Sequence, residues 1–210
     1  MYLQPAFVEA DRELLYTLIR KHPLATLVTL AHGEVAVNHL PMHLCCNAEP
    51  CLQAHVPRAS EVWRHVQDHD VTAVFHGPQS YVTPSWYPGK AAHGRVVPTW
   101  NYAVVHVRGR ARAIHEADWL MAHLQRLTNQ QEAKQAQPWQ VGDAPADFTR
   151  RLVEGLVGIE LPVTHLTGKW KVSQNRSVED QRGVLDGLGA AGPQAQPMHQ
   201  LMQTYIPDTD

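Results

Sequence analysis

The chain has 210 residues, of which 44% are hydrophobic and 18% are charged, and its formal net charge at neutral pH is −2. This length and composition predict a globular protein with a sizeable core and exclude a disordered chain. The slightly negative charge provides no global field that would draw the chain onto nucleic acid or an anionic membrane. No apolar run approaches the roughly 18 residues that a membrane span requires, and the N-terminus lacks a signal-peptide pattern.

The first third of the chain predicts one helix followed by several short strands. Asp11 is a plausible cap for a helix that ends before Pro23, because leucine and isoleucine repeat there at helical spacing. A tight turn at His32-Gly33 separates two expected strands, residues 25–30 and 34–44. The next expected elements are strands at 51–56 and 71–76, with a short helix at 63–66 between them. Successive strands joined by short turns favour an antiparallel meander or barrel.

The segment Gly77–Gly109 is rich in aromatic residues, and we expect it to form the centre of the functional site. It is expected to supply a fifth strand and a long sixth strand that runs to about Ala113. Flat side chains stand there beside hydroxyl and amide groups, which suits a planar ligand; ordinary core strands are the alternative. Three prolines interrupt ladder pairing, so these strands are expected at edges or ends. The residues concerned are Ser85, Trp86, Thr99, Trp100 and Asn101, with prolines 84, 88 and 98.

His55 and Arg58 stand at the exit of the strand at 51–56, just before the short helix. A guanidinium and the free N–H groups of a helix start stabilise a phosphate, so this motif indicates anion binding. A solvated loop arginine is the alternative. A local basic run contains Arg108, Arg110 and Arg112. Because side chains alternate between the two faces of a strand, we interpret this run as a half-solvated strand edge and not as a DNA-binding surface.

The second half predicts two helices, at 117–130 and 145–157, and a returning strand at 159–166. Lys169 and Lys171 then project on the same side of an extended segment, with Gln174 nearby. They are either a solvated strand end or cations that meet an anionic or heteroaromatic ligand. A helix from Ser177 to about Leu188 follows, then a flexible linker at 187–197 and a final helical stretch at 198–205. We therefore expect one domain over 1–186 and a tail, linker plus helix, over 187–210.

Three cysteines, Cys45, Cys46 and Cys51, lie in one expected hairpin. An odd count without regular spacing does not describe a disulfide framework, which favours a reduced, cytoplasmic setting. Ordinary strand residues are favoured over a metal site, since no histidine stands at a zinc-motif spacing. The fourteen histidines are scattered through the sequence, which argues against a dedicated metal site. A single histidine that ligates a haem is the alternative that the sequence leaves open.

Several motifs together resemble the PaiB-like family, known as FMN-binding negative transcriptional regulators. The resemblance extends over nearly the full length and rests on the strings His-Leu-Pro, Ala-His-Val with Arg-Ala, Phe-His-Gly-Pro, Pro-Ser-Trp-Tyr, Val-Pro-Thr-Trp-Asn-Tyr, and Lys-Trp-Lys with Ser-Gln-Asn. These strings begin at residues 39, 54, 75, 84, 97 and 169.

The resemblance implies an FMN-binding split β-barrel, antiparallel and of Greek-key type with peripheral helices, and a homodimer with FMN between the subunits. By analogy, His55 and Arg58 are expected near the phosphate, and Pro84, Ser85, Trp86 and the run Thr99 to Tyr102 near the ring or the dimer face. Lys169, Lys171 and Gln174 reach a site from the partner chain. The sequence departs from the family at Pro57 and Ser60, where the family more often has Ala and Asn. A proline removes an N–H that could bind phosphate, which weakens flavin affinity.

The sequence is compatible with three functions. A flavin protein, with FMN supplying the redox chemistry, has only His39, His55 and Tyr102 as candidate acids or bases. A transcriptional regulator is the family label, but no helix-turn-helix is visible and the charge balance does not support DNA binding. A haem-binding or haem-degrading split-barrel protein is the third hypothesis.

Overall fold

The computed structural model describes residues 1–31, 33–46 and 48–206, without the side chain at position 31. The chain divides into two compact units. Unit 1 contains residues 1–18, 76–105 and the chain from Thr167 onward; unit 2 contains 19–75 and 106–166. Two long strands run from one unit into the other.

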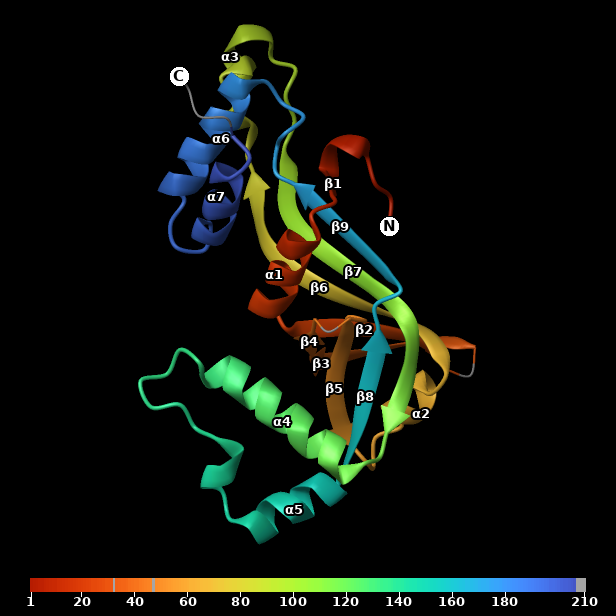
Figure 1. Ribbon diagram of the computed structural model, residues 1–210. Helices are drawn as coiled ribbons and strands as arrows, with labels where there is room; N and C mark the ends of the chain where they lie inside the picture. Colours follow the sequence, from red (N-terminus) through yellow and green to blue (C-terminus); the bar gives the residue numbers. More distant parts are fainter. Residues whose placement is uncertain (32, 47, 207–210) are drawn as a thin grey trace. The chain divides into compact units, whose positions relative to one another are not determined.

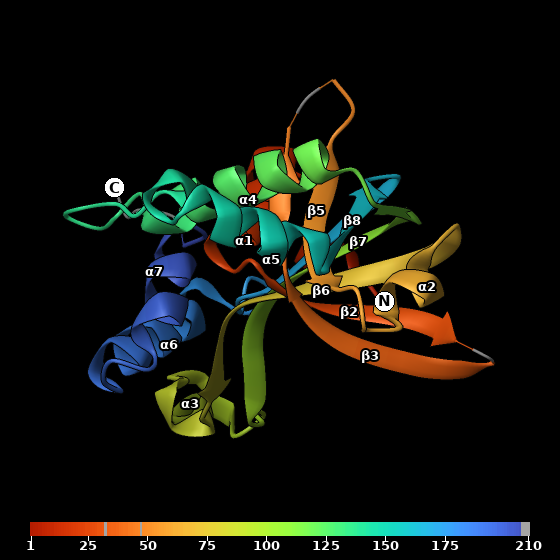
Figure 2. The same ribbon diagram turned by 90° about the horizontal axis from the view of Figure 1, so that it is seen from below.

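Unit 2 is built on antiparallel strands. Their bounds are Leu24–Ala31 for β2, Glu34–Pro41 for β3, His43–Cys45 for β4, Cys51–Pro57 for β5, His69–Val82 for β6, Thr99–Ile114 for β7 and Leu156–Pro162 for β8. The strand order is β3-β2-β6-β7-β8-β5-β4, and β2 and β3 form a long ribbon that Figure 2 shows clearly. Among the described strands β3 and β4 end this path without pairing with each other, so the sheet is open.

Apolar alternation explains which faces of these strands are buried. In β2, Ala25 and Leu27 are fully buried, and in β5 Leu52 and Ala54 are buried in the same way. Helix α4 (Ala117–Glu132) lies against β5 and β8, and it is followed by η3 (Val141–Asp143) and α5 (Ala146–Glu154) (Figure 1). The short α2 (Val62–Val66) contacts β2 and β8. Trp119 of α4 packs so closely on Gly158 that a Cβ at that position would lie 2.3 Å from its ring.

Unit 1 joins the other halves of β6 and β7 to β9 (His165–Lys171), which pairs with β7 and with the short β1 (Val8–Glu9). Its helical elements are η1 (Pro5–Phe7), the start of α1 (Arg12–Lys21), η2 (Pro84–Trp86), α3 (Gly89–His93), α6 (Val178–Ala190) and α7 (Gln196–Gln203). Helices α6 and α7 pack on each other, with Leu188, Met198 and Met202 fully buried (Figure 1).

Several sequence predictions are confirmed in detail. Asp11 accepts hydrogen bonds from the backbone N–H groups of Glu13, at 2.8 Å, and Leu14, at 3.3 Å, and thereby caps α1. Ser177 caps α6 through the N–H of Asp180 at 3.3 Å. Prolines 84, 88 and 98 all lie outside the strands. Arg108, Arg110 and Arg112 are exposed on β7 with buried residues between them, but β7 lies between β6 and β8 and is not the edge strand that was expected.

Other predictions are wrong. The strands expected at 71–76 and within the aromatic segment are one strand, β6, which continues through Gly77 and Pro78. A Cβ at Gly77 would lie 2.6 Å from a methyl group of Leu18, so glycine is needed there for close packing. The strand expected at 34–44 is divided at Met42, and that at 159–166 is divided between β8 and β9.

The predicted linker begins too early, because residues 187–190 continue α6 and bury Leu188. The domain boundary at 187 stays a prediction. Of the expected turn at His32-Gly33, His32 lies outside the described residues, whereas Gly33 has a φ of +84°, which glycine adopts without steric cost. In the described part of the chain, no helix combines the length and apolarity needed to cross a membrane.

Candidate functional site

A small cavity in unit 1 gathers several of the predicted site residues. It has a volume of about 60 Å³ and is lined by Tyr87, Thr99, Asn101, Lys171, Ser173, Asn175 and Arg176. Sequence analysis predicted Thr99, Asn101 and Lys171 among these. The described residues that line the cavity carry two cations and no carboxylate, so the cavity has the chemistry of an anion site.

Lys171 is held in place by β7. Its Nζ donates to Thr99 Oγ1 and, at 2.7 Å, to the carbonyl oxygen of Trp100. Burial, followed by the nearby charges of Arg176 and Lys169, lowers the pKa of Lys171. Burial and the two positive neighbours disfavour the charged form of Lys171, whereas a bound anion would favour that form.

Arg176 and Tyr87 form the other side of the cavity. The Arg176 guanidinium lies 5.1 Å from the centre of the Tyr87 ring. The Tyr87 hydroxyl is buried and has no hydrogen-bond partner at normal geometry, while Ser173 and Arg176 lie close enough to influence its pKa. Burial is the main cause that raises this pKa, so the hydroxyl stays protonated and is a donor available to a ligand.

Asn101 and Gln174 support the cavity through the backbone turn that follows β9. Asn101 Nδ2 donates to Ser173 Oγ at 2.9 Å. Gln174 accepts from the N–H of Val172 at 2.8 Å and donates to the carbonyl oxygen of Trp170 at 2.5 Å. The amide of Gln174 is therefore committed to its own turn.

A second cavity of about 140 Å³ lies beside the aromatic side chains of β6 and β7. Its lining includes Gln79, Trp100 and Tyr102. Trp100 Nε1 donates to Gln79 Oε1 at 3.1 Å, and the ring of Trp100 lies 6.0 Å from that of Tyr81. Trp100 and Tyr81 are both 48% exposed, so they offer flat apolar surface to a ligand or a partner.

The remaining predicted residues of unit 1 lie outside the lining of these two cavities. Ser85 is exposed and accepts from Lys90 Nζ at 3.4 Å. Trp86 packs against α6, where a Cβ at Gly187 would lie 2.3 Å from its ring. Lys169 Nζ donates to the carbonyl oxygen of Tyr2 at 3.2 Å and lies 5.5 Å from the centre of the Tyr102 ring.

Three predicted residues belong to unit 2 and are not brought together there. Arg58 donates through Nε to the carbonyl of Glu154 and through Nη2 to that of Leu156, both at 2.9 Å, which satisfies carbonyls at the end of α5. His55 Nδ1 lies 3.1 Å from His123 Nε2, and burial lowers the pKa of His55. His39 is exposed on β3. The contacts of Arg58 show a structural role that its sequence position did not reveal.

The two family departures lie beside Arg58. Pro57 ends β5, and its carbonyl accepts from the N–H of Ser60 at 2.8 Å. Ser60 Oγ accepts from the N–H of Val62 at 3.3 Å, which uses a donor at the start of α2. Sequence analysis did not predict Tyr87 and Arg176 as site residues, although Tyr87 ends the Pro-Ser-Trp-Tyr string and Arg176 follows the Ser-Gln-Asn string.

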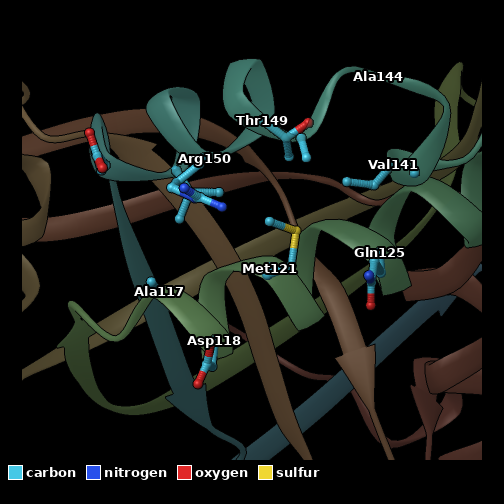
Figure 3. Close-up of a pocket in the computed structure, with 12 residues that line it drawn as sticks. Ala117, Asp118, Met121, Gln125, Val141, Ala144, Thr149 and Arg150 are labelled. Atoms are coloured by element: carbon cyan, nitrogen blue, oxygen red, sulfur yellow. The ribbon is translucent and has the colours of Figure 1, made fainter.

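A larger cavity of about 560 Å³ lies in unit 2 between α4, η3 and α5 (Figure 3). Met121, Val141 and Val153 contribute apolar surface to its lining, which also includes Asp118 and Arg150. None of the predicted site residues lines it. The cavity is therefore distinct from the anion site of unit 1.

Residues 1–165 match the family described as "Putative FMN-binding domain". The chain belongs to this FMN-binding domain family. The PaiB-like resemblance is confirmed, and FMN is the cofactor that the family's description names.

Relatives of this family extend over nearly the whole chain. An uncharacterised protein of Emericella nidulans is 31% identical over 233 residues, which cover 93% of each chain. The "Protease synthase and sporulation protein PAI 2" of Bacillus subtilis is 27% identical over 209 residues, which cover 98% of each chain.

Solved structures confirm the split β-barrel fold class. The FAD and haem binding protein of Mycobacterium smegmatis has a TM-score of 0.61 and 16% identity over 78% of this chain and 73% of that one. The flavocytochrome Anf3 of Azotobacter vinelandii has a TM-score of 0.58 and 13% identity over 80% of this chain and 72% of that one. At this identity the likeness concerns the fold alone.

Proposed function

We propose that this protein binds FMN in a seam between two copies of the chain, with the anion site of unit 1 holding the phosphate. The observation that carries this proposal is the pair of cations, Lys171 and Arg176, facing the buried Tyr87 hydroxyl in one cavity. A phosphate accepts hydrogen bonds from all three groups and neutralises both charges. Trp100 and Tyr81 would supply flat surface for the ring system.

Size favours a site that a second copy completes. The cavities of about 60 Å³ and 140 Å³ in unit 1 are below the several hundred Å³ typical of pockets that enclose a whole ligand. Each has room for only part of a flavin mononucleotide. One chain therefore offers fragments of a site, and a partner surface would enclose the rest.

The outer face of the β2–β3 ribbon supplies a surface for such a partner. Leu30 pairs with Val35, and the next pair on the same face joins Val28 and Val37. Leu30, Val35 and Val37 are 60%, 69% and 53% exposed, although the opposite face of β2 is buried. A contiguous exposed apolar surface of this kind marks an interaction site. His39 continues along the same face of β3, which would place it at the seam between the copies.

Bound FMN would supply electron chemistry, and the chain's own residues would bind and orient it and exclude water. We infer a cytoplasmic flavoprotein whose biological role is regulatory, in keeping with the family label, and for which flavin-dependent oxidoreduction is the second candidate. A regulator of this type would act through its ligand or another protein. Direct DNA contact has little support, since Arg112 already pairs with Glu160 and the net charge is −2.

The first test is an absorbance scan of the purified protein, with identification of any released chromophore, followed by titration with FMN, riboflavin and haemin. We expect flavin absorbance and tighter binding of FMN than of riboflavin. A colourless protein that ignores added FMN would end the proposal. A Soret band with no flavin binding would favour the haem alternative.

Four variants test the position of the phosphate. Lys171→Met and Arg176→Met are each expected to weaken FMN binding by roughly tenfold to a hundredfold, the value of one charge-assisted hydrogen bond, and to leave riboflavin binding nearly unchanged. Arg151→Met is the control, because Arg151 is exposed on α5 and pairs with Asp147 at 2.8 Å. Equal losses for FMN and riboflavin would remove the phosphate assignment. If Arg58→Met were the one variant that weakened FMN binding, the phosphate would be assigned to Arg58 instead.

A further inference from the structure

Two cysteines in unit 2 face each other at the end of the β4–β5 hairpin. Cys45 and Cys51 are directly opposed cross-strand partners, and both are free thiols that are neither fully buried nor fully exposed. Opposed residues of antiparallel strands have Cα atoms about 4.5–5.5 Å apart, within the 4.4–6.8 Å range that a disulfide requires. Side-chain rotation with little backbone movement is therefore sufficient to join the two sulfur atoms.

The surroundings of the two thiols differ in charge. His43 lies two residues before Cys45 on the same side of β4, and its Nδ1 lies 2.6 Å from Gln130 Oε1 of α4. Arg126 of α4 donates to Gln53 Oε1 at 2.9 Å. Arg126 thus places a positive charge, and His43 a titratable imidazole, on the side of the pair that faces α4.

On the other side, the Cys51 thiol points toward a carboxylate. Cys51 Sγ lies 3.9 Å from Glu160 Oε2 of β8. Gln53 Nε2 and Arg112 both donate to Glu160, the former at 3.1 Å, so this carboxylate is fixed in position. A negative neighbour keeps Cys51 in the thiol form.

The pKa values follow from this asymmetry. A hydrogen bond from Cys51, assisted by His43 and Arg126, lowers the pKa of Cys45 to about 5. The hydrogen bond to Cys45, burial and the charge of Glu160 raise the pKa of Cys51. A thiolate nucleophile beside a protonated resolving thiol is the arrangement that dithiol oxidation needs.

We propose that Cys45 and Cys51 form a reversible dithiol modification site that a hydroperoxide oxidises to an intramolecular disulfide. The Cys45 thiolate attacks the peroxide, the O–O bond breaks, and Cys45 becomes a sulfenic acid while an alcohol leaves after taking up a proton. The Cys51 sulfur then attacks the sulfenic sulfur, the S–O bond breaks, and water leaves with the proton of Cys51. Two thiols are oxidised and one hydroperoxide is reduced. Exchange with a small thiol reverses the modification.

The site is specific to this pair of cysteines. Cys46 is exposed on the neighbouring position, where its sulfur accepts from Arg20 Nη2 at 3.0 Å. Within residues 1–31, 33–46 and 48–206 no group of three or more His, Cys, Asp or Glu side chains is arranged to hold a metal ion. Thiol chemistry is therefore the use that this cluster supports.

The test uses the full chain in which Cys46→Ser leaves only the two opposed cysteines. Stoichiometric hydrogen peroxide is expected to remove both free thiols and to lower the intact mass by two hydrogen atoms, with no covalent dimer. Adding Cys51→Ser should stop the reaction at a sulfenic acid on Cys45 that dimedone traps. Adding Cys45→Ser instead should slow thiol loss by about tenfold or more at pH 6, where ordinary thiols are protonated.

The pH profile separates this mechanism from non-specific oxidation. The profile is measured on the Cys46→Ser protein, because Cys51 must be present to stabilise the Cys45 thiolate. Fast alkylation should persist down to about pH 5, whereas the same protein in urea should lose reactivity below about pH 8.5. Covalent dimers, a persistent sulfenic acid in Cys46→Ser, or identical folded and unfolded profiles would each overturn the proposal.

Discussion

Asn101 and Ser173 form a buried polar pair, in which Asn101 Nδ2 lies 2.9 Å from Ser173 Oγ and the two residues are 0% and 3% exposed. Asn101 belongs to β7, whereas Ser173 follows β9 with a φ of +68°, in the left-handed region that non-glycine residues seldom adopt. The pair holds the turn that leads from Lys171 to Arg176. The anion site of unit 1 therefore depends on a contact behind its cations.

Removal of this contact should loosen the turn. Asn101→Ala leaves the buried Ser173 hydroxyl without its main partner and is expected to lower the free energy of unfolding by about 1–3 kcal/mol. FMN binding should weaken as well, because Lys171 and Arg176 lose their common support. Urea unfolding followed by fluorescence measures the first effect, and FMN titration measures the second. Asn129→Ala, at an exposed position of α4, is the matched control; equal stability of the two variants would contradict the assigned role.

The close packing of α6 on the Trp86 ring leads to a second prediction. A glycine inside a helix normally costs about 0.5–1 kcal/mol relative to alanine, so Gly→Ala should stabilise the protein. At Gly187 the new Cβ would lie 2.3 Å from the Trp86 ring, and the expected result is a loss of about 1–3 kcal/mol. Gly189→Ala is the matched control in the same helix, because the nearest atom to its Cβ is His199 Nε2 at 3.3 Å. Thermal melts that rank the Gly189 variant below the Gly187 variant would refute this.

Local sequence signals predicted much of the fold. The caps at Asp11 and Ser177, the apolar spacing of the helices, and the β2–β3 alternation each depend on residues close in sequence. The continuation of β6 through Gly77 and Pro78 was not predictable in this way, because glycine and proline normally mark a turn and the reason for the glycine, its close contact with Leu18, is a tertiary one.

The residues of the candidate site likewise divide into those that local motifs predicted and those that depend on distant contacts. The motif strings identified Thr99, Asn101 and Lys171, which the structure brings to one cavity. The role of Arg58 depends on carbonyls near residue 155, almost a hundred positions away, and no local pattern reveals that contact. The pairing of Cys45 with Cys51 likewise depends on hairpin register, which composition does not determine.

A buried histidine gives unit 2 a specific sensitivity to acid. His123 of α4 is fully buried, stacks on Trp119 and contacts His55. Burial, with smaller contributions from His55, His43 and Arg126, lowers its pKa to about 3. The unfolded chain therefore takes up a proton before the folded one. The associated stability is fully present above about pH 6.5 and is lost as the pH falls toward 3.

Chemical unfolding at pH 7 and pH 5 checks this sensitivity. Over that interval His123 alone should lower the free energy of unfolding by about 2 kcal/mol. His123→Leu keeps an apolar side chain at the site without a titrating group, so the variant should lose about 2 kcal/mol less than the wild-type chain between the two pH values. The opposite shift of His43, whose pKa is raised chiefly by a hydrogen bond with Cys45, remains in both proteins and cancels. His39→Gln, at an exposed position, should behave as wild type; equal pH dependence of all three would disprove the prediction.

The apolar face of the β2–β3 ribbon predicts the oligomeric state and links it to ligand binding. Val37 is 53% exposed and lies opposite Val28, so Val37→Glu places a carboxylate in the middle of that face. If two copies bury the face against each other, an unpaired charge there costs several kcal/mol and favours separate chains. Sedimentation or light scattering should show the wild-type chain as a dimer and the Val37→Glu variant as a monomer.

Leu152→Glu is the control for Val37→Glu, because Leu152 is also 53% exposed but lies on α5. This variant should stay dimeric and keep its affinity for FMN. The Val37→Glu monomer should keep its fold, as circular dichroism would show, and lose FMN affinity, because the proposed flavin site needs both copies. A monomeric wild-type chain that binds FMN as tightly as the Val37→Glu variant would mean that one copy builds the whole site.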